Sequence, residues 1–285
     1  MRRVLGFLLM LVVLAVATGG CNPTPVIGGK PAPFIYQRGV SLSPGVTEFV
    51  TLVRSQMKLA GRTQSCNYPA GVRGLPVVMS GAKPDYEKIA SLAPEMVVYD
   101  ADLFTEQDIA KFKELNIETF GFSEPTVTGF CKELYVFATK VGGEIKYSEY
   151  VDQIQASSDR AKGAAPTTWK PKVAVVLGGS GAEHWVAGTD SFLADVVRLS
   201  GGEVLGPKAS KFSAMNAESF LAANPDVIIV AGDPTEVAND PRLKSVNAVK
   251  KGNVAGIKED ILLRKGARVN KLIDNISAII TSAHQ

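Results

Sequence analysis

Two segments of the chain repeat one pattern of helix, loop and strand. Residues 87–99 read EKIASLAPEMVVY and residues 218–230 read ESFLAANPDVIIV, and the two segments align without a gap. In each, a glutamate stands seven residues before a proline, an acid follows the proline, and an apolar run completes the segment. Because the run after the proline is typical of a buried strand, the repeat predicts two similar α/β lobes. It also places Glu87 and Glu218 at equivalent positions.

Strand and helix patterns alternate on both sides of a long helical stretch. Ser43 and Pro44 follow a short apolar segment and fit a helix start, with serine as the N-cap and proline at the first helical position. From residue 126 to residue 162 no strand pattern occurs, and apolar residues recur at helical spacing. We therefore predict an α/β fold, in which two Rossmann-like lobes with parallel sheets are joined by a long backbone helix.

The same patterns give the expected boundaries. We predict a signal peptide at residues 1–20, a lipoprotein tether at 21–36, an N-terminal α/β lobe at 37–125, a helical connector at 126–168 and a C-terminal α/β lobe at 169–285. Gly142-Gly143 is a predicted break in the connector. A length of 285 residues suffices for two lobes of ordinary domain size.

The N-terminus has the order of a secretory signal. Arg2 and Arg3 precede an apolar run from Val4 to Ala17, and small residues then lead to Cys21. The apolar run is short for a bilayer span, which takes about 20 residues. The segment before Cys21 resembles a bacterial lipobox, which implies a lipid anchor on that thiol. The alternative is an ordinary signal cut near Gly20, with Cys21 unmodified.

The cysteines bear on the redox state of the protein, and the net charge bears on the kind of partner it can bind. Cys66 and Cys131 form either a disulfide, as expected in an oxidising compartment, or two buried thiols, and the sequence leaves both alternatives open. Without the two arginines of the signal, 29 basic residues face 28 acidic ones. Such a balance gives no excess of positive charge for a nucleic-acid surface.

Seven segments together resemble a known family. They are Ser41-Leu42-Ser43-Pro44 with Thr47-Glu48, Cys66-Asn67-Tyr68-Pro69, the Glu87 helix, Trp185 to Gly202, the Glu218 helix, Ala248 to Gly252, and Asp260 with Arg264 and Arg268. In this order, from about residue 40 onward, they resemble the periplasmic binding proteins of ABC importers for cobalamin, siderophores and haem, which have a helical backbone between two lobes.

The resemblance implies a ligand between the lobes. The residues at matching ligand-binding positions are Ser43, Pro44, Tyr68, Trp185, Phe212 and Asp260. It also implies that Glu87 and Glu218 meet arginines on an ABC permease, which works with an ATPase. The helix macrodipole alone also favours an acid in the first turn of a helix. The expected protein is an exported, lipid-anchored monomer that is not an enzyme.

The implied ligand is a corrinoid such as cobalamin. Tyr68, Trp185 and Phe212 suit the apolar rim of a corrin, and Asp260 suits its amides. The alternatives are a ferric siderophore, which Lys211, Arg264 and Arg268 could attract, and haem, whose iron His184 could bind. We expect no cofactor beyond the transported ligand.

Three other classes compete with this interpretation. A receptor for a free metal ion usually needs several histidines and carboxylates, and the chain has only His184 and the penultimate His284, so no metal site is predicted. Residues 178–181 read GGSG, which matches neither a nucleophile elbow nor a nucleotide-binding loop, so an enzyme is disfavoured. A lipoprotein that senses its ligand without transport remains open, because fold alone does not fix function.

Overall fold

The computed structural model describes residues 36–53, 56–178 and 183–283. The predicted signal peptide, Cys21, nearly all of the predicted tether, most of the GGSG segment and His284 lie outside these residues. None of the helices in the described part of the chain combines the length and the apolar character that a bilayer span needs.

The N-terminal lobe is built on a parallel sheet. Its strands are β1 (Arg38–Ser41), β2 (Lys58–Thr63), β3 (Val77–Met79), β4 (Met96–Asp100) and β5 (Glu118–Phe122), in the order β3-β2-β1-β4-β5. Its helices are α1 (Pro44–Leu52), α2 (Tyr86–Ser91) and α3 (Glu106–Glu114), with short 3₁₀ turns at Ala70–Gly74 and Ala101–Leu103. In the central strands, Val40 of β1 and Met96, Val97 and Val98 of β4 are all fully buried, as expected for a sheet covered on both faces.

The C-terminal lobe has a mixed sheet in the order β11-β10-β6-β7-β9, with β8 paired to β6. The strands are β6 (Lys172–Val176), β7 (Glu183–Ala187), β8 (Glu203–Val204), β9 (Phe212–Asn216), β10 (Val227–Ala231) and β11 (Val254–Ile257). Its helices are α6 (Phe192–Leu199), α7 (Ala217–Ala223), α8 (Thr235–Ala238), α9 (Asn247–Lys250) and α10 (Glu259–Leu262), with a 3₁₀ turn at Pro241–Leu243. Strand β7 runs antiparallel to both neighbours, a departure from a purely parallel sheet.

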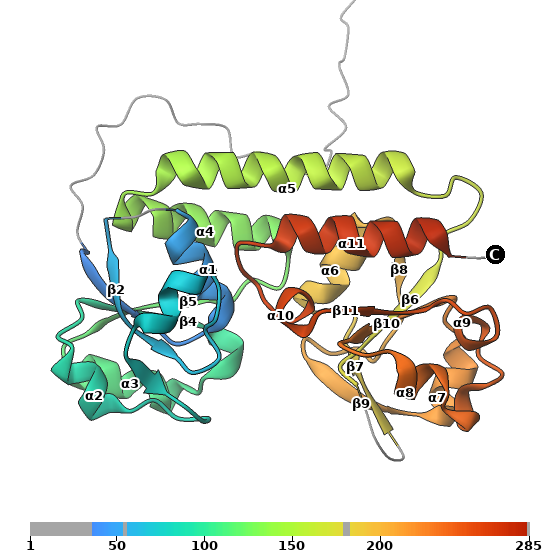
Figure 1. Cartoon of the computed structure of the whole chain (residues 1–285), viewed down its shortest axis with the longest axis horizontal. Coiled ribbons are helices and arrows are strands. Elements are labelled where there is room, and N and C mark those ends of the chain that lie inside the picture. Colours follow the sequence, from blue (N-terminus) through green and yellow to red (C-terminus); the bar gives the residue numbers. More distant parts are fainter. Residues whose placement is uncertain (1–35, 54–55, 179–182, 284–285) are drawn as a thin grey trace, which may run out of the picture.

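A layer of helices lies above both lobes (Figure 1). It consists of α4 (Val127–Val141), α5 (Glu144–Ala164) and α11 (Val269–Ser282), the last helix of the chain, which packs along α5. The predicted break is present, since α4 ends at Val141 and its C-cap Gly142 has a left-handed φ of 71°, which favours glycine. The long α5 spans both lobes, so the predicted α/β architecture with a backbone helix is confirmed.

One apolar core runs through this helical layer into both lobes. It joins buried side chains of α1 and β4 to those of α4, α5 and α11 and then to β6 and β10. Two smaller clusters fill the other faces of the two sheets. Because both lobes pack against the same helices, the helical layer holds the two sheets in place relative to each other.

Candidate functional site

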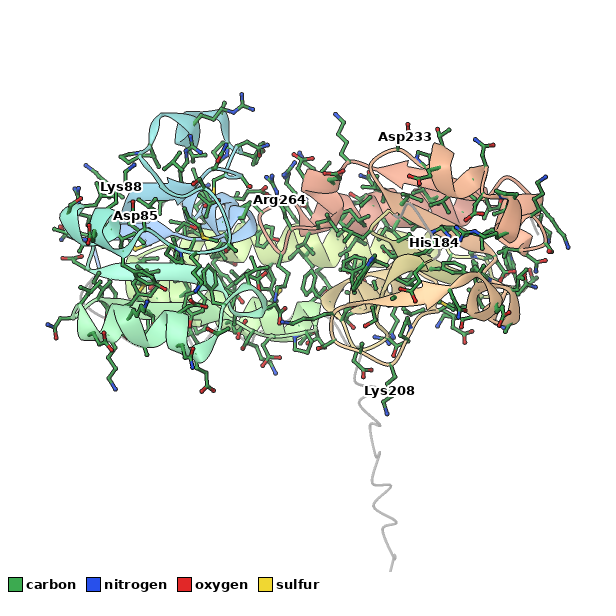
Figure 2. All side chains as sticks on the ribbon, turned by 90° about the horizontal axis from the view of Figure 1, so that it is seen from below. Asp85, Lys88, His184, Lys208, Asp233 and Arg264 are labelled. Atoms are coloured by element: carbon green, nitrogen blue, oxygen red, sulfur yellow. The ribbon has the colours of Figure 1, made fainter. Side chains whose placement is uncertain are left out.

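Two adjoining cavities lie between the lobes, on the side of the molecule away from the helical layer. The polar cavity, of about 710 Å³, is lined by Ser43, Pro44, Ser65 and Asn67 of the N-terminal lobe and by residues 258–265 of the C-terminal lobe, apart from Ile261 and Leu262. The apolar cavity, of about 430 Å³, includes Trp185 and Phe212. Both share Asp100, Leu103, Leu263, Arg264 and Lys265. Figure 2 looks onto this side, with Arg264 between the lobes. The cavities therefore form one interlobe cleft.

The apolar cavity owes its wall to two paired strands. In the antiparallel register of β7 and β9, Trp185 is opposite Ala214 and Ala187 is opposite Phe212. Since alternate residues of a strand share a face, Trp185 and Phe212 lie on the same face of the sheet. Trp185 is 49% exposed, although tryptophan is usually well covered. An exposed indole beside a second ring is a surface suited to a flat apolar ligand.

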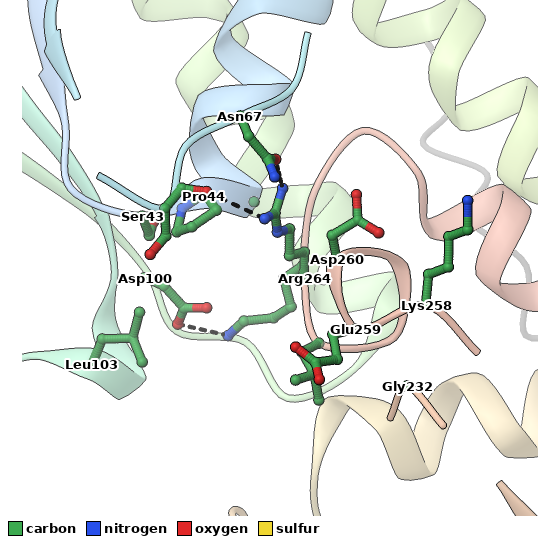
Figure 3. A pocket seen from close by; sticks show the side chains of 14 residues that line it. Ser43, Pro44, Asn67, Asp100, Leu103, Gly232, Lys258, Glu259, Asp260 and Arg264 are labelled. Atoms are coloured by element: carbon green, nitrogen blue, oxygen red, sulfur yellow. Dashed lines mark hydrogen bonds and ion pairs between the residues drawn. The ribbon is translucent and has the colours of Figure 1, made fainter. Parts of the chain in front are cut away.

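Beneath the cleft, one buried carboxylate joins the lobes. Glu48 of α1 is inaccessible to solvent and accepts hydrogen bonds from Arg264 (3.0 Å) and Arg268 (2.6 and 2.9 Å) of the other lobe. Arg264 also donates to the side chain of Asn67 (2.8 Å), as Figure 3 shows, and Arg268 donates to Asp260 (2.9 Å). Both guanidinium groups are thus largely neutralised within the protein.

A second ionic group lies at the wall shared by the cavities. Lys265 pairs with Asp100 and Asp102, each at 3.1 Å, and Lys211 donates to the backbone carbonyl of Asp102 at 2.8 Å. Burial by itself would lower the pKa of Lys265, but the two carboxylates outweigh burial and raise it. Burial raises the pKa of Asp100, and Lys265 opposes that shift. These contacts connect the lobes at the side of the cleft.

The predicted site residues divide into three groups. Ser43, Pro44 and Asp260 line the polar cavity, and Trp185 and Phe212 line the apolar one. Tyr68 lines neither cavity, but its ring, 40% exposed, covers the guanidinium of Arg268 at 4.5 Å. Glu87 and Glu218 are exposed on α2 and α7 and contribute to neither cavity.

Sequence reasoning missed the shared wall of the cleft. Asp100 is the last residue of β4, and Asp102 and Leu103 lie in the turn that follows it. Lys265 lies in the sequence between Arg264 and Arg268, which the family resemblance had named. A usable pattern existed, since the loops at the carboxyl ends of parallel strands are where such folds bind ligands. Applied to the strand after Pro94, this rule would have named Asp100 and Asp102.

His184 does not face the cleft, which corrects the expectation that it could bind haem iron. Its ring is 1% exposed on the face of β7 opposite Trp185, and its Nε2 lies 3.0 Å from Asp240. Its ring also contacts Phe220 edge-on. Hydrogen bonds from Arg242, with a smaller contribution from His184, lower the pKa of Asp240 to about 2. His184 is therefore part of the core and its buried ionic group.

The structure also gives the state of the two cysteines and the placement of potential metal ligands. Cys66 and Cys131 are both buried and are not joined by a disulfide, which is the second of the two alternatives left open. The Cys66 thiol lies 3.0 Å from the hydroxyl of Thr47 and 3.1 Å from that of Thr63. Within the described ranges, no cluster of histidine, cysteine and acidic residues could hold a metal ion.

Comparison with known sequences gives a family match. A family model for periplasmic binding proteins matches residues 40–261. Among curated proteins, the high-affinity heme uptake system protein IsdE of Staphylococcus aureus is 24% identical over 193 residues, which make up 66% of this chain and 65% of that protein. The chain therefore matches slightly less than two thirds of this relative's length.

Solved structures share the fold. The periplasmic vitamin B12 binding protein BtuF of Vibrio cholerae aligns with a TM-score of 0.75 and 18% identity over 87% of this chain and 98% of that chain. The periplasmic heme binding protein HutB of the same organism aligns with a TM-score of 0.73 and 19% identity over 86% and 98%. At sequence identities this low, the structural alignments show a common fold alone.

Proposed function

The chain belongs to the periplasmic binding protein family, and from this premise we propose that it captures a small ligand in the interlobe cleft and delivers it to an ABC permease and its ATPase. The cleft supports a binding role, because both lobes contribute side chains to one cavity system. We further propose that the protein is exported and held at a membrane by a lipid on Cys21. A sensor without a permease would share the cleft but would have no use for docking acids on both lobes.

The charge balance of the cleft is the observation that most restricts the ligand. Among the described residues, the two cavities are lined by four acids and four bases, namely Asp100, Asp102, Glu259, Asp260, Lys211, Lys258, Arg264 and Lys265. The guanidinium of Arg264 and the ammonium of Lys265 already have carboxylate partners. A cleft with no net charge gives little attraction to a ligand that carries several negative charges.

We propose that the ligand is a corrinoid such as cobalamin. Cobalamin has no net charge at neutral pH, and its own groups occupy the axial positions of its cobalt, so it needs no metal ligand from the protein. Its apolar ring edge suits Trp185 and Phe212, and its amides can donate to Asp260 or Asn67. These properties agree with the apolar wall and the neutral lining of the cleft.

Haem is the second candidate, favoured by one specific feature. Tyr68 is 40% exposed and directly follows Asn67, which lines the polar cavity, and tyrosine is one of the side chains that bind haem iron. Against haem, the described lining of the two cavities contains no histidine, cysteine, methionine or tyrosine, and the propionates of haem would meet a neutral cleft. We therefore rank haem below the corrinoid, and a ferric siderophore after both.

Tryptophan fluorescence tests the choice of ligand, since the chain has two tryptophans. Trp185 lines the cleft, whereas Trp169 lies between α5 and β6 and lines neither cavity. We expect saturable quenching by cyanocobalamin at micromolar protein, retained in Trp169→Phe and lost in Trp185→Ala. Haemin and a ferric siderophore should give no saturable change. Saturable quenching by haemin alone would make haem the proposed ligand. The absence of saturable quenching by any of the three would refute the proposal that the ligand is a corrinoid.

A further inference from the structure

The N-terminus of α1 opens into the polar cavity. Ser43, Pro44 and Gly45, the N-cap and the first two residues of this nine-residue helix, all line it. The first N–H groups of a helix have no partner within the helix, and Pro44 has no N–H. The donors that remain at this end are the N–H groups of Gly45 and Val46. A serine N-cap usually accepts from one of them, but the Ser43 side chain makes no such bond.

The Ser43 hydroxyl is left without a partner. The side chain is 2% exposed, and its Oγ has no hydrogen-bond partner among the described residues. The backbone around it is nevertheless held firmly, because the Ser43 carbonyl accepts from Thr47 N (3.0 Å), Thr47 Oγ1 (3.0 Å) and Ser41 Oγ (3.2 Å). Since a buried hydroxyl without a partner costs free energy, a ligand atom that bonds to it gains that free energy.

The start of α1 is also fixed against the other lobe. A Cβ atom at Gly45 would lie 2.3 Å from the carbonyl oxygen of Lys265, so only glycine allows this approach. Figure 3 shows Ser43 and Pro44 at the wall of the polar cavity, with Arg264 and Asp260 extending from the other lobe. The hydroxyl and the two N–H groups are therefore rigid donors at the junction of the lobes.

The charges nearby limit what these donors can bind. The N-terminus of a helix favours an anion, and among the described residues no hydrogen-bond acceptor is found for the N–H groups of Gly45 and Val46. Asp100, Glu259 and Asp260 line the same cavity and would repel a group with several negative charges. Asp100 and Asp260 are paired with Lys265 and Arg268, and these cations weaken the repulsion that the two carboxylates exert. A single negative charge is therefore tolerated in the cavity better than several. A singly charged oxygen acceptor fits this environment best.

We propose that Ser43 Oγ and the first N–H groups of α1 form an oxyanion subsite in the cleft, which takes a phosphodiester oxygen of the transported ligand. The assignment to a phosphodiester rests on the proposed corrinoid, whose nucleotide loop carries one such group. The donors themselves do not depend on that identity, because they would bind any singly charged oxygen that reaches them.

Inorganic phosphate below its second pKa, where it is mainly the singly charged H₂PO₄⁻, probes the subsite without the ligand. In ¹H–¹⁵N spectra of the full protein, the amide signals of Gly45 and Val46 should shift saturably as phosphate is added, and Ser43→Ala should weaken the apparent affinity about 10- to 100-fold. The matched control is Thr126→Ala, because Thr126 is the N-cap of α4 and its hydroxyl accepts a hydrogen bond from the backbone of that helix. This variant should leave the phosphate response unchanged. Unmoved Gly45 and Val46 signals, or equal responses in wild type and Ser43→Ala, would overturn the subsite.

Two corrinoids test the phosphodiester. Cyanocobalamin contains a phosphodiester, whereas dicyanocobinamide lacks the nucleotide loop that carries it. Ser43→Ala should therefore weaken the binding of cyanocobalamin about 10- to 100-fold and leave the affinity for dicyanocobinamide unchanged. Equal losses for both would refute the phosphodiester assignment. If neither corrinoid binds but phosphate still shifts Gly45 and Val46, the corrinoid is wrong and the subsite stands. Should Ser43→Ala fail to fold, the wild-type phosphate shifts decide the outcome.

Discussion

Glu48 joins the two lobes through a buried ionic group. It is fully buried in α1 and receives hydrogen bonds from two arginines more than 200 residues later in the chain. A buried carboxylate is tolerated only when partners compensate for its lost hydration, and here two guanidinium groups do so. Removal of this carboxylate leaves two largely buried cations without their common partner.

We therefore expect Glu48→Gln to lower the free energy of unfolding by about 3 kcal/mol, the lower end of what breaking a buried ion pair costs. Urea denaturation followed by circular dichroism measures the change. Glu149→Gln is the control, because Glu149 pairs with Lys146 in an exposed i,i+3 contact and should cost under about 1 kcal/mol. Equal stability of the two variants would contradict the structural role of Glu48.

Single residues of the cleft could be predicted only in part. Alternation along a strand separates Trp185 from His184, and the sequence could have excluded His184 from the cleft had β7 been recognised. The pairing of Glu48 with Arg264 could not be predicted, because it depends on how two lobes sit on a shared helical layer. No local pattern encodes a contact 216 residues apart.

The repeated helix and strand are the elements that the sequence predicted best. Helix α2 with β4 and helix α7 with β10 occupy corresponding places, and the N-caps Asp85 and Asn216 both accept from the backbone three residues on. Glu87 and Glu218 are the second residue of their helices and are exposed. The two helices lie at the ends of the lobes away from the helical layer (Figure 1).

If these acids dock on a permease, Glu87→Arg combined with Glu218→Arg should abolish uptake in cells and leave ligand affinity within about twofold, since neither residue lines a cavity. The substitutions also reverse a charge near a helix N-terminus, which costs about 0.3 to 1 kcal/mol each. Glu106→Arg, in the first turn of α3, controls for that cost and should preserve uptake. Normal uptake by the double variant would mean that the two glutamates do not dock on a permease and act only as acids near helix N-termini.

Strands with weak apolar character were missed. β7 reads EHWVA and β9 reads FSAMN, and neither has the run of branched apolar residues that marked β6 and β10. They are strands because they pair with each other in antiparallel register, beside the already buried β6. Strand formation of this kind depends on tertiary context more than on local propensity.

At the scale of the whole molecule, one helical layer carries two lobes and leaves a cleft on the opposite side (Figure 1). The alternating pattern predicted this architecture, but not that the last helix, α11, returns to the layer and packs along α5. Local periodicity identifies an amphipathic helix without naming its partner. Our proposed boundary at residue 169 accordingly assigns α11 to the C-terminal lobe by sequence order, although it packs in the helical layer.

Anchoring is the second property of the whole molecule. We expect the mature chain to begin at Cys21 with a lipid on its thiol, so Cys21→Ser should move the protein from the membrane fraction to the soluble one. A single acyl chain binds membranes only marginally, so stable retention implies more than one. Mass spectrometry of the purified N-terminus checks the modification, and an unmodified terminus at another residue would exclude the anchor.

The central claim is that a corrinoid binds between the lobes, and the structure of crystals grown with cyanocobalamin tests it most directly. We predict density for one corrin in the cleft, with its apolar edge against Trp185 and Phe212 and its phosphodiester at the N-terminus of α1. A corrin bound elsewhere on the molecule, or an empty cleft under conditions where binding in solution is saturated, would contradict the claim.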